Sequence, residues 1–131
     1  MGSATGYDQD FFAWADEQAG LLRAGRLAEA DIVHIADEIE SMGKSEKREL
    51  VSRLTVLLLH LLKWRFQPAL RSHSWRNSVR VQRITLASLI RDNPSLMSVR
   101  PDTVAEAYRI ARIEAEGETG IPEATFPPVC P

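Results

Sequence analysis

Three arginines line one edge of the helix expected over residues 75–91. Arg76, Arg80 and Arg83 are spaced i, i+4 and i+7, so they lie along one side, at the border of the apolar face. A guanidinium group is a planar, permanently charged fork that suits carboxylates and phosphates. The spacing therefore predicts either ion pairs with neighbouring helices or an anion-binding surface. Arg71 belongs to the same basic segment, since residues 63–100 contain eight basic residues and one carboxylate, Asp92.

Carboxylates that could pair with these arginines lie on the preceding helical segment. Asp31, His34 and Glu38 are spaced i, i+3 and i+7 along one border of the apolar stripe expected over residues 28–42. Charged groups at the edge of a buried face are normally paired. The pattern therefore predicts an interhelical charge network in which Asp31 and Glu38 meet the arginine-lined helix. The arginines left unpaired would remain available to an external anion.

The same border residues allow a metal-binding interpretation. Helical bundles hold metals with inward carboxylates and histidines, and Asp31, His34 and Glu38 share one face. The Glu-x-x-His pair that is typical of di-iron bundles is absent. His60 lies on the polar strip of its helix and His73 in a connection, so neither is placed to complete a site. We therefore expect no metal or other cofactor, and a metal-dependent enzyme remains a third hypothesis.

No other motif for catalysis is present in the sequence. No serine has a nucleophile-elbow setting, and no glycine-rich loop precedes a helix. The single cysteine, Cys130, lies between prolines with no group nearby that would lower its pKa. The sequence therefore favours a protein without catalytic activity of its own.

Glycine and proline divide the chain into helix-sized segments, and no segment has the alternation of a strand. Gly25, Gly43, Gln67-Pro68 and Asn93-Pro94 are the expected breaks. The expected helices span residues 8–24, 28–42, 45–66, 75–91 and about 101–116. We therefore predict an all-α, mostly antiparallel bundle of about five helices, followed by an extended, proline-rich C-terminal tail pinned by Ile121 and Phe126.

Length and composition predict one soluble domain. The chain has 131 residues, 44% of them hydrophobic and 26% charged, with a net charge of −2. Its first ten residues lack a basic start and an apolar stretch, so no secretory signal is expected. The longest apolar run, Val56–Leu59, is far shorter than the roughly 20 residues that span a bilayer. We expect a single-domain cytoplasmic protein without membrane contact.

Apolar residues outside the predicted core indicate a protein–protein interface. Val81 and Ile84 lie off the inner face of the fourth expected helix, and Ile110 and Ile113 off that of the fifth. They serve either as a second contact inside the fold or as an interface, most simply in a two-fold homodimer. The leading hypothesis is a non-catalytic interaction module that self-associates. Binding of another protein partner is also compatible with this pattern. The alternative is a nucleic-acid-binding protein that uses the arginine stripe.

The whole chain resembles a bacterial family known only as domain of unknown function 29. The landmarks are Tyr7, Asp10, Phe11 and Trp14, the run from Ala28 to Arg76 with HLLKW, QP and SW in order, Asn93-Pro94-Ser95-Leu96, Glu118-Thr119-Gly120, Phe126-Pro127 and Cys130-Pro131. The resemblance implies a helical bundle in a bacterial cytoplasm. It implies no catalytic residues, because the family has no established chemistry to carry over.

Overall fold

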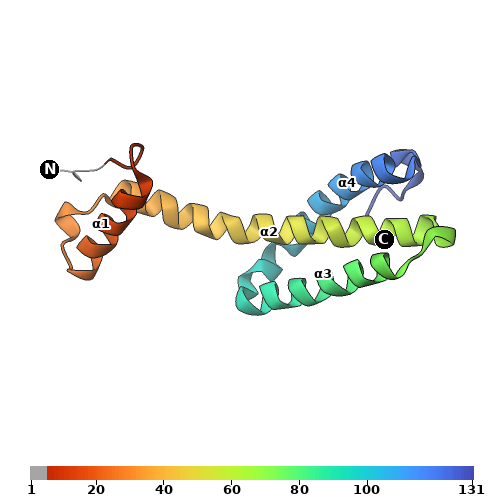
Figure 1. Ribbon diagram of the computed structural model, residues 1–131, viewed down its shortest axis with the longest axis horizontal. Helices are drawn as coiled ribbons and strands as arrows, with labels where there is room; N and C mark the ends of the chain where they lie inside the picture. The colour runs from red at the N-terminus through yellow and green to blue at the C-terminus, as the bar shows by residue number, and fades with distance from the viewer. Residues whose placement is uncertain (1–5) are drawn as a thin grey trace. The chain divides into compact units, whose positions relative to one another are not determined.

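The computed structural model describes residues 6–131, and its regular elements are all helical (Figure 1). The four α-helices within these residues are α1 (Phe11–Arg23), α2 (Ile32–Phe66), α3 (His73–Asp92) and α4 (Arg100–Thr119). Short 3₁₀ turns, η1 to η4, cover Leu27–Glu29, Pro68–Leu70, Pro94–Val99 and Glu123–Thr125. None of the helices in this part of the chain is both long and apolar enough to pass through a bilayer. The all-α prediction is confirmed.

The expected number of helices was wrong, because two expected helices form one. α2 runs through Gly43 and Ser45, where the sequence predicted a break and the start of the next helix. Gly43 keeps a negative φ, and the described glycines with positive φ are Gly25 and Gly120. A glycine inside a helix costs only about 1 kcal/mol relative to alanine, which the good helix formers around it offset.

Polar side chains cap the starts of α1 and α3, and a glycine ends α4. The Asp10 carboxylate accepts from the Ala13 N–H at the start of α1, and Ser72 accepts from the Trp75 N–H at the start of α3. The helix ranges expected from sequence, 8–24 and 75–91, would begin at Asp8 and directly after Ser74, each two residues away from the observed cap. α4 continues past Gly117 and ends at Gly120, whose φ of 75° suits a residue without a Cβ.

The contacts within the chain divide it into two compact units, Met1–Lys44 and Ser45–Pro131, which are called unit 1 and unit 2 below. The single-domain organisation stays a prediction. In unit 1, α1 buries Trp14 and Gln18. The part of α2 in this unit contributes no fully buried residue. Unit 1 therefore has a small core centred on one tryptophan.

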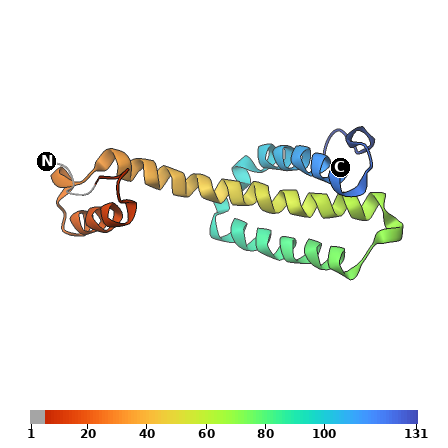
Figure 2. The ribbon, with the colours of Figure 1, turned by 45° about the horizontal axis from the view of Figure 1, so that its top comes forward.

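Unit 2 is built around the second half of α2. Figures 1 and 2 show α3 along one side of this segment and α4 along another. Leu50 of α2 packs with Leu89 of α3 and Leu96 of η3. Lys63, further along α2, meets Trp75 at the start of α3, so these two helices are antiparallel. The antiparallel part of the prediction therefore holds for this pair.

The second cluster of unit 2 includes the C-terminal segment. Leu59 and Leu62 of α2 pack with three residues of α4 and with Phe126, which is only 1% exposed. Ile121 packs against the same cluster, and the Tyr108 hydroxyl donates to the Pro127 carbonyl at 2.6 Å. The segment after α4 contains the η4 turn and is anchored at several points. The expected extended, proline-rich tail is therefore not confirmed.

Candidate functional site

Asp31 organises a polar and aromatic cluster in unit 1. It directly precedes α2, and its Oδ1 accepts from the His34 N–H at 3.4 Å, so it caps that helix. Its Oδ2 accepts from Trp14 Nε1 at 3.0 Å and lies 2.8 Å from His34 Nδ1. Its backbone N–H donates to Gln18 Oε1 at 2.7 Å. One carboxylate therefore joins α1 to the start of α2.

Tyr7 closes this cluster from the N-terminal side. Its ring stacks on the His34 imidazole, with centroids 4.2 Å apart and an interplanar angle of 8°. It also meets the Trp14 ring edge-on at 4.8 Å. The Tyr7 hydroxyl donates to Glu38 Oε1. This hydrogen bond, burial of the ring and the charge of the carboxylate raise the pKa of Tyr7 to about 12.

The cluster contains an Asp–His pair, but its geometry favours a structural role. The hydrogen bond from His34 lowers the pKa of Asp31, and the same bond raises the pKa of His34. Within residues 6–131, no three His, Cys, Asp or Glu side chains converge as metal ligands. Glu38 is engaged by Tyr7 rather than directed at His34. The metal-binding interpretation of Asp31, His34 and Glu38 therefore gains no support from their geometry.

Replacing Asp31 by asparagine is expected to lower the pKa of His34 toward its ordinary value of 6.5. The raised pKa means that the protonated imidazole stabilises the fold fully below about pH 6.5 and that this stabilisation is lost as the pH rises through the folded pKa. Asp31, with its lowered pKa, stabilises the fold above about pH 4 and loses this effect as the pH falls. Imidazole NMR titration measures the shift. Asp37→Asn, the control with the same charge change, is expected to shift the pKa of His34 much less, and equal shifts would contradict the pairing.

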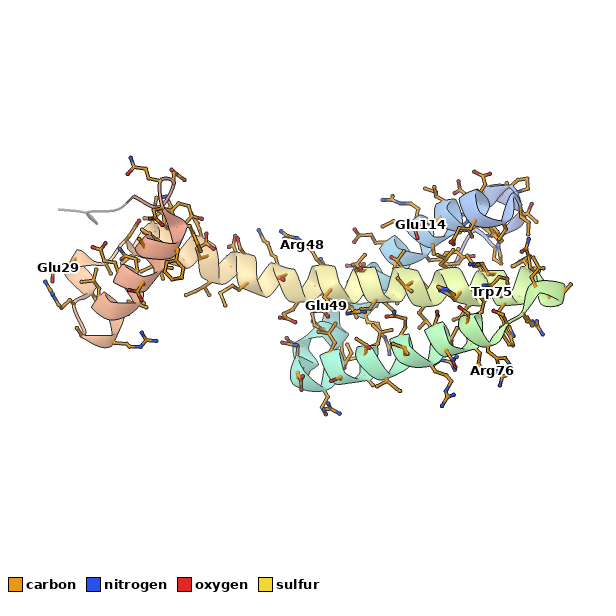
Figure 3. All side chains as sticks on the ribbon, in the orientation of Figure 1. Glu29, Arg48, Glu49, Trp75, Arg76 and Glu114 are labelled. Carbon is orange, nitrogen blue, oxygen red and sulfur yellow. The ribbon has the colours of Figure 1, made fainter. Side chains whose placement is uncertain are left out.

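The arginine stripe lines a groove in unit 2. Arg76, Arg80 and Arg83 of α3 form its rim, and Leu61, Trp64 and Val79 form its apolar floor. The groove has a volume of about 220 Å³. The three arginines are exposed rather than half-buried, and none of them forms an ion pair within the described residues 6–131. Figure 3 shows Trp75 between α2 and α3, with the neighbouring Arg76 extending outward from α3.

The tryptophans near this groove already have cationic partners. The Arg71 guanidinium lies 4.8 Å from the Trp64 ring centroid and donates from Nε to the Trp64 carbonyl at 2.8 Å. Lys63 Nζ lies 4.8 Å from the Trp75 ring centroid and 3.7 Å from a carboxylate oxygen of Glu118. Each ring therefore has a cation over its face.

The predicted network between Asp31, Glu38 and the arginines is not among the ion pairs of the described residues. Both carboxylates have partners within unit 1, as described above. The sequence spacing placed Asp31 correctly beside His34, but it missed that Asp31 caps α2. It also missed the approach of Tyr7, although Tyr7, Phe11 and Trp14 are spaced i, i+4 and i+7 and could have indicated an aromatic cluster.

Exposed apolar side chains concentrate in unit 1, which the sequence did not predict. Among residues 6–131, fourteen large apolar residues are exposed, and eight of them lie between Phe11 and Met42, which makes this region the main candidate for an interface. They are Phe11, Phe12, Leu22, Leu27, Ile32, Val33, Ile39 and Met42. Of the four interface residues predicted from sequence, Val81, Ile84 and Ile113 are exposed and Ile110 is half-buried.

A second groove of unit 2 lies between α4 and the C-terminal segment. It has a volume of about 450 Å³, and its lining includes Val104, Tyr108, Val129 and Cys130. Burial raises the pKa of the Cys130 thiol, so the thiolate that would act as a nucleophile is disfavoured. The lining of this groove is therefore better suited to packing against apolar groups than to nucleophilic chemistry at Cys130.

Comparison with known protein families identifies the family of this chain. Residues 6–131 match the family described as "Domain of unknown function DUF29". The chain belongs to this family. No curated protein and no solved structure matches it. The family description names no activity.

Proposed function

We propose that this chain is a bacterial, cytoplasmic and non-catalytic interaction module that self-associates as a homodimer. The observation that carries the proposal is the apolar surface of unit 1. Ile32, Ile35, Ile39 and Met42 are spaced i, i+3, i+7 and i+10 on α2, as in a helix that packs against a partner. Three residues of this stripe are exposed, Ile32 by 52%, Ile39 by 64% and Met42 by 68%, whereas Ile35 is half-buried.

Such a surface is unusual on a protein that works alone. Monomeric proteins rarely expose large contiguous apolar patches, and patches rimmed by polar residues mark binding sites. Here the apolar residues of α2 alternate with charged ones, among them Asp37 and Glu40. Removing the apolar groups from water supplies the driving force for association. A second copy of the chain is a partner that is present whenever the protein is present.

Two alternatives are less well supported by the described residues. A protein that binds single-stranded nucleic acid by stacking needs open aromatic faces, but Trp64 and Trp75 each hold a cation over the ring. A metal-dependent enzyme needs converging ligands, and the Asp31, His34 and Glu38 side chains divide between two hydrogen-bonded pairs. Both alternatives therefore rank below self-association.

Sedimentation velocity at micromolar concentration tests the proposal. We expect a dimer, and we expect Ile39→Gln combined with Met42→Gln to raise its dissociation constant by about tenfold or more, since two apolar contacts are lost. Glutamine is uncharged and a good helix former, so the fold should survive, which circular dichroism checks.

The matched control is Val81→Gln combined with Ile84→Gln on α3, where the two side chains are 54% and 70% exposed. It is expected to leave the dimer nearly unchanged. Dissociation by this pair alone would place the contact on α3, as the sequence first indicated, and would refute the assignment to unit 1. A wild-type chain that stays monomeric would refute self-association itself.

A further inference from the structure

The arginine-lined groove of unit 2 combines two properties that specify its ligand. Its rim carries three guanidinium groups that have no carboxylate partner among the described residues, and its floor is apolar. A free inorganic anion would use only the rim. An apolar side chain bordered by carboxylates would use both, because the side chain covers the floor while arginine binds carboxylate through paired hydrogen bonds.

The charges of the chain are divided between its two units. Unit 1 contains nine acidic and three basic residues, a net charge of −6, whereas unit 2 contains thirteen basic and nine acidic residues, a net charge of +4. Two copies of unit 1 that meet face to face would repel each other. The acidic unit of one copy and the basic unit of another attract.

Unit 1 presents a suitable side chain on α1. Phe12 is 85% exposed, more than any other large apolar residue in the described part of the chain. Asp16 follows at i+4 and therefore lies on the same side of the helix. Asp16 is exposed and takes part in no ion pair within residues 6–131. An aromatic ring and a carboxylate thus lie one helical turn apart.

We propose that Phe12 of one copy inserts between the arginines of a second copy, with Asp16 bound to the guanidinium rim formed by Arg76, Arg80 and Arg83. The inference rests on the proposed self-association and adds a charged contact to the apolar contact proposed for α2. Each copy offers one acidic, aromatic surface and one arginine-lined groove, so two such contacts made reciprocally about a two-fold axis would close the homodimer.

A charge exchange tests this contact by sedimentation velocity on the full chain. Arg80→Glu and Asp16→Arg, each alone, are expected to raise the dissociation constant of the dimer by about tenfold or more. Both changes in one chain restore an opposite-charge pair, so the dissociation constant is expected to return to within about threefold of the wild-type value. The wild-type dimer is also expected to weaken as salt is added.

Arg109→Glu is the matched control, because it makes the same charge change at an exposed position of α4 outside the groove. It should leave association unchanged. A monomeric wild type would refute the proposed function. If the wild type is a dimer and both single charge reversals leave it intact, the groove contact would be refuted and self-association would stand. The same holds if the single reversals dissociate the dimer and the double change fails to restore it. Tight binding of a single-stranded oligonucleotide that Arg80→Glu abolishes would instead make the groove a nucleic-acid site and overturn the proposal.

Discussion

Replacing Phe126 by alanine is expected to lower the free energy of unfolding of unit 2 by about 3–5 kcal/mol. Phe126 is buried in the cluster formed with α2 and α4, and its ring meets Phe66 edge-on with centroids 5.0 Å apart. Two of its neighbours, Ala111 and Ala115, are already fully buried and too small to fill the space that the ring would leave. The cavity would therefore persist, and the loss should approach the upper end of that range.

Hydrogen exchange of the α4 amides measures this loss, because those amides exchange when unit 2 opens. Val129→Ala is the control, since Val129 lies three residues further along and is exposed. It should cost less than about 0.5 kcal/mol. A loss below about 1 kcal/mol for Phe126→Ala would contradict the anchoring of the C-terminal segment.

Replacing Trp14 by alanine is expected to unfold unit 1, with a loss of about 3–5 kcal/mol. Trp14 is the one large apolar side chain that is fully buried in the described part of this unit. Its ring contacts Tyr7, Phe11 and His34, and its indole N–H donates to Asp31. Its removal takes away the centre of the aromatic cluster and one of the hydrogen bonds that tie α1 to α2.

Trp14→Phe separates these two contributions. It keeps an aromatic ring and removes the hydrogen bond to a charged acceptor, which is worth about 1.5–3 kcal/mol. Circular dichroism and exchange of the α1 amides should therefore show a smaller loss than for alanine. Leu27→Ala, at an exposed position of η1, is the control and should change little. Retention of protected α1 amides in Trp14→Ala would show that unit 1 has another source of stability.

The ends of the helices were predictable from sequence where the local start and stop signals agree. They were less predictable where two such signals lie close together or where a weak signal falls inside a strong helix. Asn93-Pro94 ends α3 as expected, because proline disfavours helical geometry at the preceding residue. The predicted break at Gly43 was wrong because a glycine lowers helix stability only slightly and only locally. Helix formation is cooperative, so the residues on both sides of Gly43 carry the helix through it. Ser72 and Ser74 are both good caps by type, and only the path of the chain after η2 selects Ser72.

The candidate surfaces were harder to predict than the helices. The spacing of Arg76, Arg80 and Arg83 placed them on one edge of α3, but exposure depends on what packs beside that edge. The stripe from Ile32 to Met42 has the periodicity of a core face, and periodicity alone does not distinguish a core inside the chain from an interface. Tyr7 reaches Glu38 across 31 positions of sequence, and no local rule predicts such a contact.

The place of Phe126 in unit 2 also bears on the order of events during synthesis. Leu59 and Leu62 emerge from the ribosome more than sixty residues before the ring that covers them. Their cluster therefore stays open to water and to chaperones until the segment after α4 has been translated. Tyr7, Trp14, Asp31 and Glu38, by contrast, lie within the first forty residues and can meet as soon as the start of α2 is free. The nascent chain would thus present its acidic, aromatic surface before its basic groove is complete.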